Sequence, residues 1–364
     1  MASPLIGIYS QASDAHVERV VTALRRQGCR WIQFDDADLP FALQLSAELA
    51  SPEARAGWCG RLRLSPSAEP LPLTDLRSLW YRRPSRRYGF PEGLTTEGAA
   101  FAAAEARHGL GGLLRSLPCL WVSSPDAIRA ASWKPLQLAV AQRLGWRIPR
   151  TLLTNDPQAV LDFFERCEER VVYKPLSQGL PRPAPGQWQG GIYTTRLSRQ
   201  DVQAHLPTLS LTFQLFQEAI PKRADVRVTV IGARLFAVAM TAPEDSPAQI
   251  DFRLDYGALR YEGHQLPAEQ EAACLALVGT FRLQFAAIDL VLTPEGEYVF
   301  LELNPNGQWG WLEEATGLPL AASLAALLAG QAEPCPWPAQ AQPHARLPLP
   351  VPPPGPAQDQ EGTR

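Results

Sequence analysis

The stretch that most constrains this chain is residues 298–307, which read YVFLELNPNG. Its first six residues are apolar or aromatic apart from one acid, which predicts a buried strand, and Pro305 and Gly307 prevent that strand from continuing. Side chains alternate between the two faces of a strand, so Glu302 and Asn304 point to the same side. A carboxylate inside such an apolar strand needs an ion-pair partner or a metal ion.

A second apolar strand with a single acid is predicted at residues 285–292. Residues 293–297 form a turn short enough to join the two strands as an antiparallel hairpin, which places Asp289 beside Glu302 and Asn304. Two carboxylates and an amide are hard oxygen donors of the kind that Mg²⁺ prefers. The acids could instead be ion-paired or exposed, but three converging donors with apolar flanks favour a metal site.

Composition limits the class of protein. A chain of 364 residues is long enough for two or three domains, and 46% hydrophobic with 20% charged residues indicates a globular protein. The net charge of −3 provides no overall field that would attract nucleic acid or an acidic membrane. The longest apolar run, residues 318–329, is too short to span a bilayer, and the N-terminal residues lack the charged segment of a secretory signal. We therefore expect a soluble, cytoplasmic protein that binds neither nucleic acid nor membrane.

The six cysteines do not indicate a metal centre or a covalent framework. They are scattered along the chain, with no Cys-x-x-Cys pair and no nearby histidines. This spacing predicts neither a zinc site nor a set of disulfides, and reduced thiols are the plain interpretation.

The N-terminal third predicts a parallel sheet. A strand at residues 5–9, a helix capped by Asp14 and a strand at residues 31–34 form a β-α-β unit. No glycine-rich phosphate loop follows the first strand, which argues against a dinucleotide site. After a further strand at residues 78–81, four arginines either grip an acidic peptide or a phosphate or simply lie in water: Arg82, Arg83, Arg86 and Arg87.

Two lysines and a loop distinguish the middle of the chain. Residues 126–144 are predicted to be one helix with Lys134 near its middle, and residues 171–174 a strand that ends at Lys174. A lysine at the end of a strand suits a phosphate, although a surface lysine is equally plausible for Lys174 taken alone. The loop from Ser177 to Gly191 is rich in glycine and proline, and loops of this length are either lids or insertions.

Two acid-x-arginine pairs follow. Asp225 and Arg227 share one face of a predicted strand, and Asp251 and Arg253 repeat the spacing. Each arginine could serve a site or could form an ion pair with its neighbouring aspartate. From residue 334 onward Pro, Ala and Gln dominate, so we expect that tail to be disordered or polyproline-like.

Taken in order from residue 124 to residue 330, these features resemble the ATP-grasp superfamily. The two lysines, the lid, a Gln-Glu pair at a strand end and the final Asp and Glu-x-Asn carry this likeness together, although no single one would. A closer resemblance is to the ATP-grasp peptide maturases that make microviridins and other graspetides. It rests on LWYRRP at 79–84, KPLQL at 134–138, VYKP at 172–175, QE at 217–218, KRADVR at 222–227, DFR at 251–253 and LELNPNGQW at 301–309.

The resemblance implies an α/β fold that is α+β in its C-terminal half, namely an ATP-grasp fold preceded by a β-α-β pre-ATP-grasp domain. On this basis we expect a pre-ATP-grasp domain at residues 1–124 and a central subdomain with the phosphate lid at 125–212. A C-terminal subdomain with the metal site is expected at 213–332, and the Pro-rich tail at 333–364.

The resemblance also implies which residues hold the nucleotide. Lys134 and Lys174 would contact the α- and β-phosphates, and the Ser177 to Gly191 lid would close over them. The strand end formed by Gln217, Glu218 and Ala219 would receive adenine through backbone groups and the Glu218 carboxylate. Asp225 stands where related enzymes place a ribose-binding acid, or else it orients Arg227.

Metal and catalytic roles follow in the same way. Asp289, Glu302 and Asn304 would carry two Mg²⁺. Dipeptide ligases of the superfamily have an arginine two residues before the metal aspartate, where this chain has Ala287. The missing cation must come from elsewhere, so Arg227 and Arg253 become the candidates for holding the γ-phosphate and the acceptor carboxylate.

The implied function is an ATP-dependent ligase that acts on a ribosomally made precursor peptide. It would activate Asp or Glu side chains as acyl phosphates and join them to Ser or Thr hydroxyls or Lys amines, which forms macrocycles. Two alternatives are an amino-acid ligase that extends peptide or protein C-termini and a peptide-binding protein that has lost turnover. A homodimer is implied by the resemblance alone.

Overall fold

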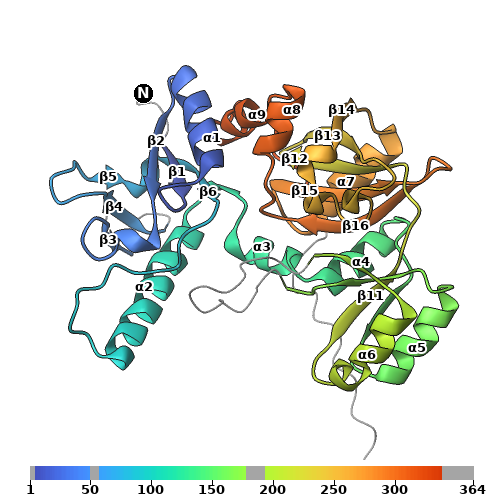
Figure 1. Cartoon of the computed structure of the whole chain (residues 1–364). Coiled ribbons are helices and arrows are strands. Elements are labelled where there is room, and N and C mark those ends of the chain that lie inside the picture. The colour runs from blue at the N-terminus through green and yellow to red at the C-terminus, as the bar shows by residue number, and fades with distance from the viewer. Residues whose placement is uncertain (1–4, 50–56, 178–192, 338–364) are drawn as a thin grey trace, which may run out of the picture.

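The computed structural model describes residues 5–49, 57–177 and 193–337 (Figure 1). Apart from Ser177, the predicted lid lies outside the described residues, and so does the tail beyond residue 337. The start of the predicted tail is ordered instead, because Cys335 is buried and its N–H donates to Gln284 Oε1 at 2.7 Å. Within the described part of the chain, no helix is long and apolar enough to cross a membrane.

The N-terminal part is built on a four-stranded sheet of order β2-β1-β6-β7, in which every pairing is parallel. This confirms the predicted β-α-β opening. Asp14 caps helix α1 by accepting from the backbone N–H groups of His16 and Val17. The elements are β1 (Leu5–Tyr9), α1 (Ala15–Arg26), β2 (Arg30–Phe34), β6 (Leu76–Tyr81) and β7 (Leu120–Val122).

A small antiparallel sheet and a long helix complete the N-terminal part. The sheet has the order β3-β4-β5, and the helix is an alanine-rich segment. Their bounds are β3 (Gln44–Glu48), β4 (Cys59–Arg63), β5 (Leu71–Pro72) and α2 (Thr96–Ser116).

The single helix expected at residues 126–144 is wrong. The structure has two helices here, α3 (Pro125–Ala131) and α4 (Lys134–Arg143), so Lys134 begins a helix instead of lying in its middle. Pro135 explains the break, because proline lacks an N–H group and is tolerated only in the first turn of a helix. The consequence is that Lys134 stands at a helix N-terminus that faces strand β16.

The central part is an antiparallel sheet of order β10-β9-β11-β8 covered by two helices. Val160, Phe163 and Phe164 of α5 pack with Val171 and Phe216 of the sheet in one apolar cluster. The elements are β8 (Thr151–Thr154), α5 (Pro157–Arg166), β9 (Val171–Lys174), β10 (Thr195–Leu197), α6 (Arg199–Leu209) and β11 (Gln214–Glu218).

The C-terminal part is a five-stranded antiparallel sheet of order β14-β13-β12-β15-β16. All eight residues of β12 are buried, and Val226, Val228 and Val230 face the apolar cluster that includes α7 and α4. Asp225 and Arg227 therefore face the other side of the sheet. The elements are β12 (Ala224–Ile231), β13 (Arg234–Thr241), β14 (Arg260–His264), α7 (Ala268–Thr280), β15 (Phe285–Leu292) and β16 (Tyr298–Asn304).

Two short C-terminal helices connect this sheet to the N-terminal part. In Figure 1 α8 (Gly310–Thr316) and α9 (Leu320–Leu328) lie between α1 and the five-stranded sheet. Leu324 and Leu327 of α9 share one apolar cluster with Ile6, Val20 and Leu24 of the N-terminal part. The last described helix thus completes the core around the first strand and helix.

Candidate active site

The predicted hairpin brings its three polar side chains to one face of the sheet. Strands β15 and β16 pair antiparallel, with Asp289 opposite Glu302 and Ala287 opposite Asn304. Ile288 and Leu290 point to the other face, into the core beneath α7. The two carboxylates and the amide therefore lie together on the face that also carries Arg227.

Glu302 is surrounded by cations from three separate elements. Its Oε2 atom lies 2.8 Å from Lys134 Nζ at the start of α4, and its Oε1 atom 4.0 Å from Arg253 Nη1. Burial opposes ionisation of Glu302, but Lys134, Lys174 and Arg253 outweigh it and hold its pKa well below the usual range. The carboxylate is therefore charged, and because the Glu302 side chain is 20% exposed, it can be reached from solvent.

Asp289 is held closely by Arg227. Arg227 Nη1 donates to both Asp289 oxygens, at 2.7 and 2.6 Å, from the neighbouring strand β12. Burial raises the pKa of Asp289, although the charge of Arg227 works against this increase. Arg227 Nη2 also donates to the Gln308 carbonyl at 3.2 Å, so this arginine ties the aspartate to the loop after β16.

Lys174 completes the cationic side of the site from the end of β9. Burial lowers its pKa, and the nearby charges of Lys134 and Arg253 lower it further, whereas Glu302 raises it. The two lysines that the sequence singles out thus come from different parts of the fold and lie close enough to influence the same carboxylate.

Arg253 pairs with Asp251, as one of the two interpretations of that motif predicts. Its Nε atom lies 2.8 Å from Asp251 Oδ1 and its Nη2 atom 2.6 Å from Oδ2. Asp251 also accepts from the backbone N–H of Thr194 at 3.1 Å, and the Arg253 guanidinium lies 5.6 Å from the centre of the Tyr193 ring. Arg253 remains 35% exposed, so its charge is accessible to a ligand.

Asp225 does not pair with Arg227 on its own strand. Its carboxylate accepts from Lys222 Nζ at 2.6 Å, and Lys222 also donates to the Ala248 carbonyl at 3.1 Å. Burial raises the pKa of Asp225 to about 6. The role of orienting Arg227 is therefore wrong, because Arg227 pairs with Asp289, whereas the role toward a ribose stays a prediction.

The strand end expected to receive adenine is engaged within the protein. Glu218 accepts two hydrogen bonds from Arg150, at 2.9 and 3.0 Å. The backbone N–H groups of Glu218 and Ala219 donate to the carbonyls of Arg150 and Arg170. Gln217 is 1% exposed, and its side chain donates to Thr151 Oγ1 at 3.0 Å while its Oε1 atom has no partner in the described chain. The adenine contacts stay predictions.

Sequence reasoning missed two residues near the site. Arg150 precedes β8 and could not be linked to Glu218 without the pairing of β8 with β11. Tyr256 begins the short helical turn after the one that contains Arg253, and its ring lies 5.4 Å from that of Trp311. Burial raises the pKa of Tyr256, and the charges of Arg227, Arg253 and Asp289 act on its phenol, so it lies close to the site. No sequence signal points to Tyr256 except its closeness to Arg253.

A metal site here depends on the amide as a third donor. Among residues 5–49, 57–177 and 193–337, no three His, Cys, Asp or Glu side chains cluster so as to bind a metal ion. Asp289, Glu302 and Asn304 nevertheless offer oxygen atoms on one face, and a carboxylate–carboxylate–amide set fits Mg²⁺.

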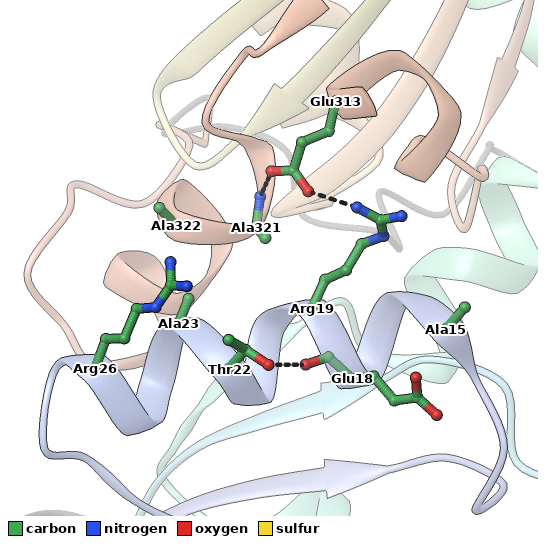
Figure 2. Close-up of a pocket in the computed structure, with 9 residues that line it drawn as sticks. All are labelled: Ala15, Glu18, Arg19, Thr22, Ala23, Arg26, Glu313, Ala321 and Ala322. Atoms are coloured by element: carbon green, nitrogen blue, oxygen red, sulfur yellow. Dashed lines mark hydrogen bonds and ion pairs between the residues drawn. The ribbon is translucent and has the colours of Figure 1, made fainter. Parts of the chain in front are cut away.

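An open hollow of about 470 Å³ lies away from this chemistry, between α1 and the α8–α9 segment (Figure 2). Arg19 and Glu313 face each other across it, with 3.5 Å between Nη1 and Oε2. No residue that the sequence singles out lines this hollow.

A family model described as the MvdD pre-ATP grasp domain matches residues 5–129. Among solved structures, a RiPP-associated ATP-grasp ligase from Chryseobacterium gregarium, in complex with ADP and with a leader and core peptide, superposes with a TM-score of 0.79. It is 26% identical, over 91% of this chain and 98% of that one. The chain is an ATP-grasp ligase.

A second solved structure supports the same assignment. The macrocyclase MdnC from Microcystis aeruginosa MRC, bound with precursor peptide MdnA, has a TM-score of 0.74 and 28% identity over 90% of this ligase and 100% of MdnC. The ligase PsnB, complexed with a minimal precursor, Mg and ADP, shares the fold at a TM-score of 0.68 and 23% identity, over 91% of this ligase and 98% of PsnB. No curated protein matches this ligase.

Proposed function

We propose that this ligase uses ATP and magnesium to form macrocycles in a ribosomally made precursor peptide, joining Asp or Glu side chains to Ser or Thr hydroxyls or Lys amines. The observation that carries the proposal is the convergence of Lys134, Lys174 and Arg253 on Glu302, directly opposite Asp289. Such an arrangement suits a highly charged nucleotide together with a second anion. The relatives with bound precursor peptides support a peptide as that second substrate.

The chemistry balances as two substitutions. A substrate carboxylate oxygen attacks the γ-phosphorus of ATP and ADP leaves, which gives an acyl phosphate. A hydroxyl or amine then attacks the acyl carbon and loses one proton, and phosphate departs with the oxygen that the carboxylate loses. The peptide is left lighter by one water for each ring, as an ω-ester or an ω-amide.

The protein's contribution to these steps is positioning and neutralisation of charge. Lys134 and Lys174 would hold the α- and β-phosphates, each as a compact positive charge. Arg253 keeps a third of its side chain exposed, so it would hold the γ-phosphate or the acceptor carboxylate. Arg227 is 6% exposed and already donates to Asp289 and Gln308, so its role would be to hold these two residues in position.

Magnesium would be held by Asp289, Glu302 and Asn304, where it would neutralise charge on the nucleotide phosphates. The number of ions bound is part of the proposal, and two fit the number of oxygen donors. Asp289 is oriented by Arg227 and Glu302 by Lys134, so both carboxylates are fixed before any ion arrives.

The proposal is tested by incubating the protein with ATP, Mg²⁺ and a small peptide encoded beside its gene, followed by intact-mass measurement. We expect a loss of one water per ring with release of ADP, and neither change with Asn304→Ala. A peptide that gains the mass of an amino acid would replace the proposal with the amino-acid ligase. Absence of ADP release with every neighbouring peptide would favour a binding protein without turnover.

A further inference from the structure

Three side chains from the N-terminal part, two buried and one partly buried, reach the loop that follows β16. Asp14 caps α1, His16 lies in the first turn of that helix, and Arg82 follows the end of β6. The loop they contact, residues 304–310, begins at Asn304, one of the three oxygen donors of the site. None of these three residues has a role in the function proposed above.

Arg82 fixes the first half of the loop. It is 1% exposed, and its Nη1 atom donates to the Asn306 carbonyl at 2.8 Å, to Asn306 Oδ1 at 3.1 Å and to the Gly307 carbonyl at 3.4 Å. Its Nε atom lies 3.3 Å from Asp14 Oδ2. Burial lowers the pKa of Arg82 to about 10 although Asp14 opposes this shift, so the guanidinium stays charged at neutral pH. Neither a peptide-gripping nor a solvated role, the two interpretations that the sequence offers, fits Arg82.

His16 fixes the second half of the loop. Its Nε2 atom lies 3.1 Å from both Trp309 N and Gly310 N, and it can only accept from these backbone N–H groups. The other ring nitrogen, Nδ1, lies 3.4 Å from Asp14 Oδ1 and must carry the proton for Nε2 to accept. One carboxylate therefore holds both the arginine and the histidine that contact the loop.

The same loop is fixed from the opposite side by the site itself. Asn304 Oδ1 accepts from the backbone N–H of Asn306 at 3.2 Å, and Arg227 donates to the Gln308 carbonyl. Gly307 is packed so closely that a Cβ atom there would lie 2.6 Å from Ala287 Cβ and 2.8 Å from Arg227 Nη2. A displacement of the loop would therefore move Asn304 and disturb the Arg227–Asp289 pair.

We propose that His16 is a positioning residue for the reaction, because its Nε2 atom holds the backbone at Trp309 and Gly310 and so fixes the geometry of the oxygen donors at Asn304 and Asp289. This inference rests on the proposed function for its effect on catalysis. Through Asp14 and His16, the N-terminal part sets the geometry of the magnesium site from outside it.

Two near-isosteric variants test the inference. In His16→Gln the amide oxygen reaches the place of Nε2 and can accept from the loop, whereas in His16→Asn the side chain stops at the place of Nδ1. Both keep a polar side chain in the first turn of α1, so both should fold. Arg19→Gln is the matched control, because Arg19 lies on the same helix and pairs with Glu313 (Figure 2). It also pairs with Glu314, and no hydrogen bond joins it to residues 304–310.

The first measurement is backbone hydrogen exchange over residues 304–312. Loss of the acceptor in His16→Asn should speed exchange at Trp309 and Gly310 about tenfold, while His16→Gln and Arg19→Gln match the wild type. This result does not depend on activity, so it decides the contact even if the proposed function fails. Equal exchange in all four proteins would overturn the inference.

The second measurement is ADP release as a function of Mg²⁺ concentration. Groups that orient metal ligands typically change metal affinity by about tenfold or more, so His16→Asn should raise the half-saturating Mg²⁺ concentration by that factor. His16→Gln should restore the wild-type value within about threefold. If His16→Gln is impaired as much as His16→Asn, ring packing rather than the Nε2 acceptor is responsible and the proposal is wrong. A wild type that releases no ADP refutes the proposed function instead.

Discussion

Asp289 and Glu302 face each other across two paired strands, yet their surroundings differ in kind. Asp289 is buried with one arginine that comes from the adjacent strand of the same sheet, and its pKa is raised. Glu302 is partly exposed among cations that come from α4, β9 and the turn after β13, and its pKa is lowered. One carboxylate is neutralised within its sheet, whereas the other gathers charges from across the fold.

The difference suggests how the two carboxylates contribute to function. A nucleotide phosphate that binds beside Glu302 can share the surrounding lysines with this carboxylate, because three cations act on one carboxylate there. At Asp289 the paired cation is not available in this way, since Arg227 has 6% exposure and is committed to the aspartate and to Gln308. Replacing Glu302 should therefore affect mainly the reaction, and replacing Asp289 should also affect the fold.

The largest effect is expected for Glu302→Gln, which removes a magnesium ligand but keeps the size of the side chain. ADP release should fall by about 10³-fold, the upper range for loss of one well-placed electrostatic group. Binding of nucleotide without Mg²⁺ should not weaken, because Lys134 and Lys174 lose a competing partner. Steady-state ADP release and calorimetric titration with ATP measure the two quantities. Activity within about tenfold of the wild type would show that Glu302 does not bind the catalytic magnesium.

Asp289→Asn should destabilise the protein by about 3–5 kcal/mol, because it leaves Arg227 buried without a counter-charge. The double variant Arg227→Met/Asp289→Leu removes both charges and should regain most of this loss while remaining inactive. Chemical denaturation of the three proteins gives the free energies of unfolding. If the double variant is as unstable as Asp289→Asn, packing rather than an unpaired charge is responsible.

A smaller effect is expected for Asp14→Asn, which keeps a residue suited to capping α1 but removes the charge between Arg82 and His16. The substitution should lower the free energy of unfolding by about 2 kcal/mol at neutral pH. Burial opposes ionisation of Asp14, but His16 and Arg82 outweigh it, so the folded pKa lies below the unfolded value. The unfolded chain therefore binds the proton more readily, and acid removes the stabilisation.

The pH dependence of that contribution has a definite sign. The stabilisation that the charge of Asp14 contributes is complete above about pH 5. It is lost as the pH falls from about 4, the pKa of the unfolded chain, toward the lower pKa of the folded protein. The wild type should thus lose more stability than Asp14→Asn between pH 6 and pH 3, which denaturation at each pH measures. Parallel losses in the two proteins would show that the charge of Asp14 contributes nothing.

Local patterns predicted the parts of the site that depend on neighbouring residues. The hairpin of β15 and β16 follows from alternation and a short turn, and it brings Asp289, Glu302 and Asn304 to one face as expected. The break between α3 and α4 also has a local cause, because Pro135 lies in the first turn of α4. The apolar pattern continues across this break and therefore predicts a single helix.

Contacts between distant segments could not be predicted in the same way. The sequence offers Asp225, on the same strand, as the partner of Arg227, but the strand order places β15 beside β12 and so supplies Asp289. Arg82 was expected at the surface or on a ligand, yet it is buried against Asn306, 224 residues further along the chain. The sequence pattern around an arginine does not reveal such a partner, because only the packing of the two parts brings it there.

The shared core of α1 and α9 has a consequence for how the chain is made. Leu324 and Leu327 cover Ile6, Val20 and Leu24, and Ser78 Oγ donates to the Leu328 carbonyl at 2.8 Å. On a ribosome that adds about 5–20 residues per second, α9 emerges roughly 10–40 s after β7. Until then Ile6, Val20 and Leu24 lack the part of their cover that α9 provides. A nascent chain should therefore need a chaperone or a slow, late docking step that an isolated purified enzyme never reveals.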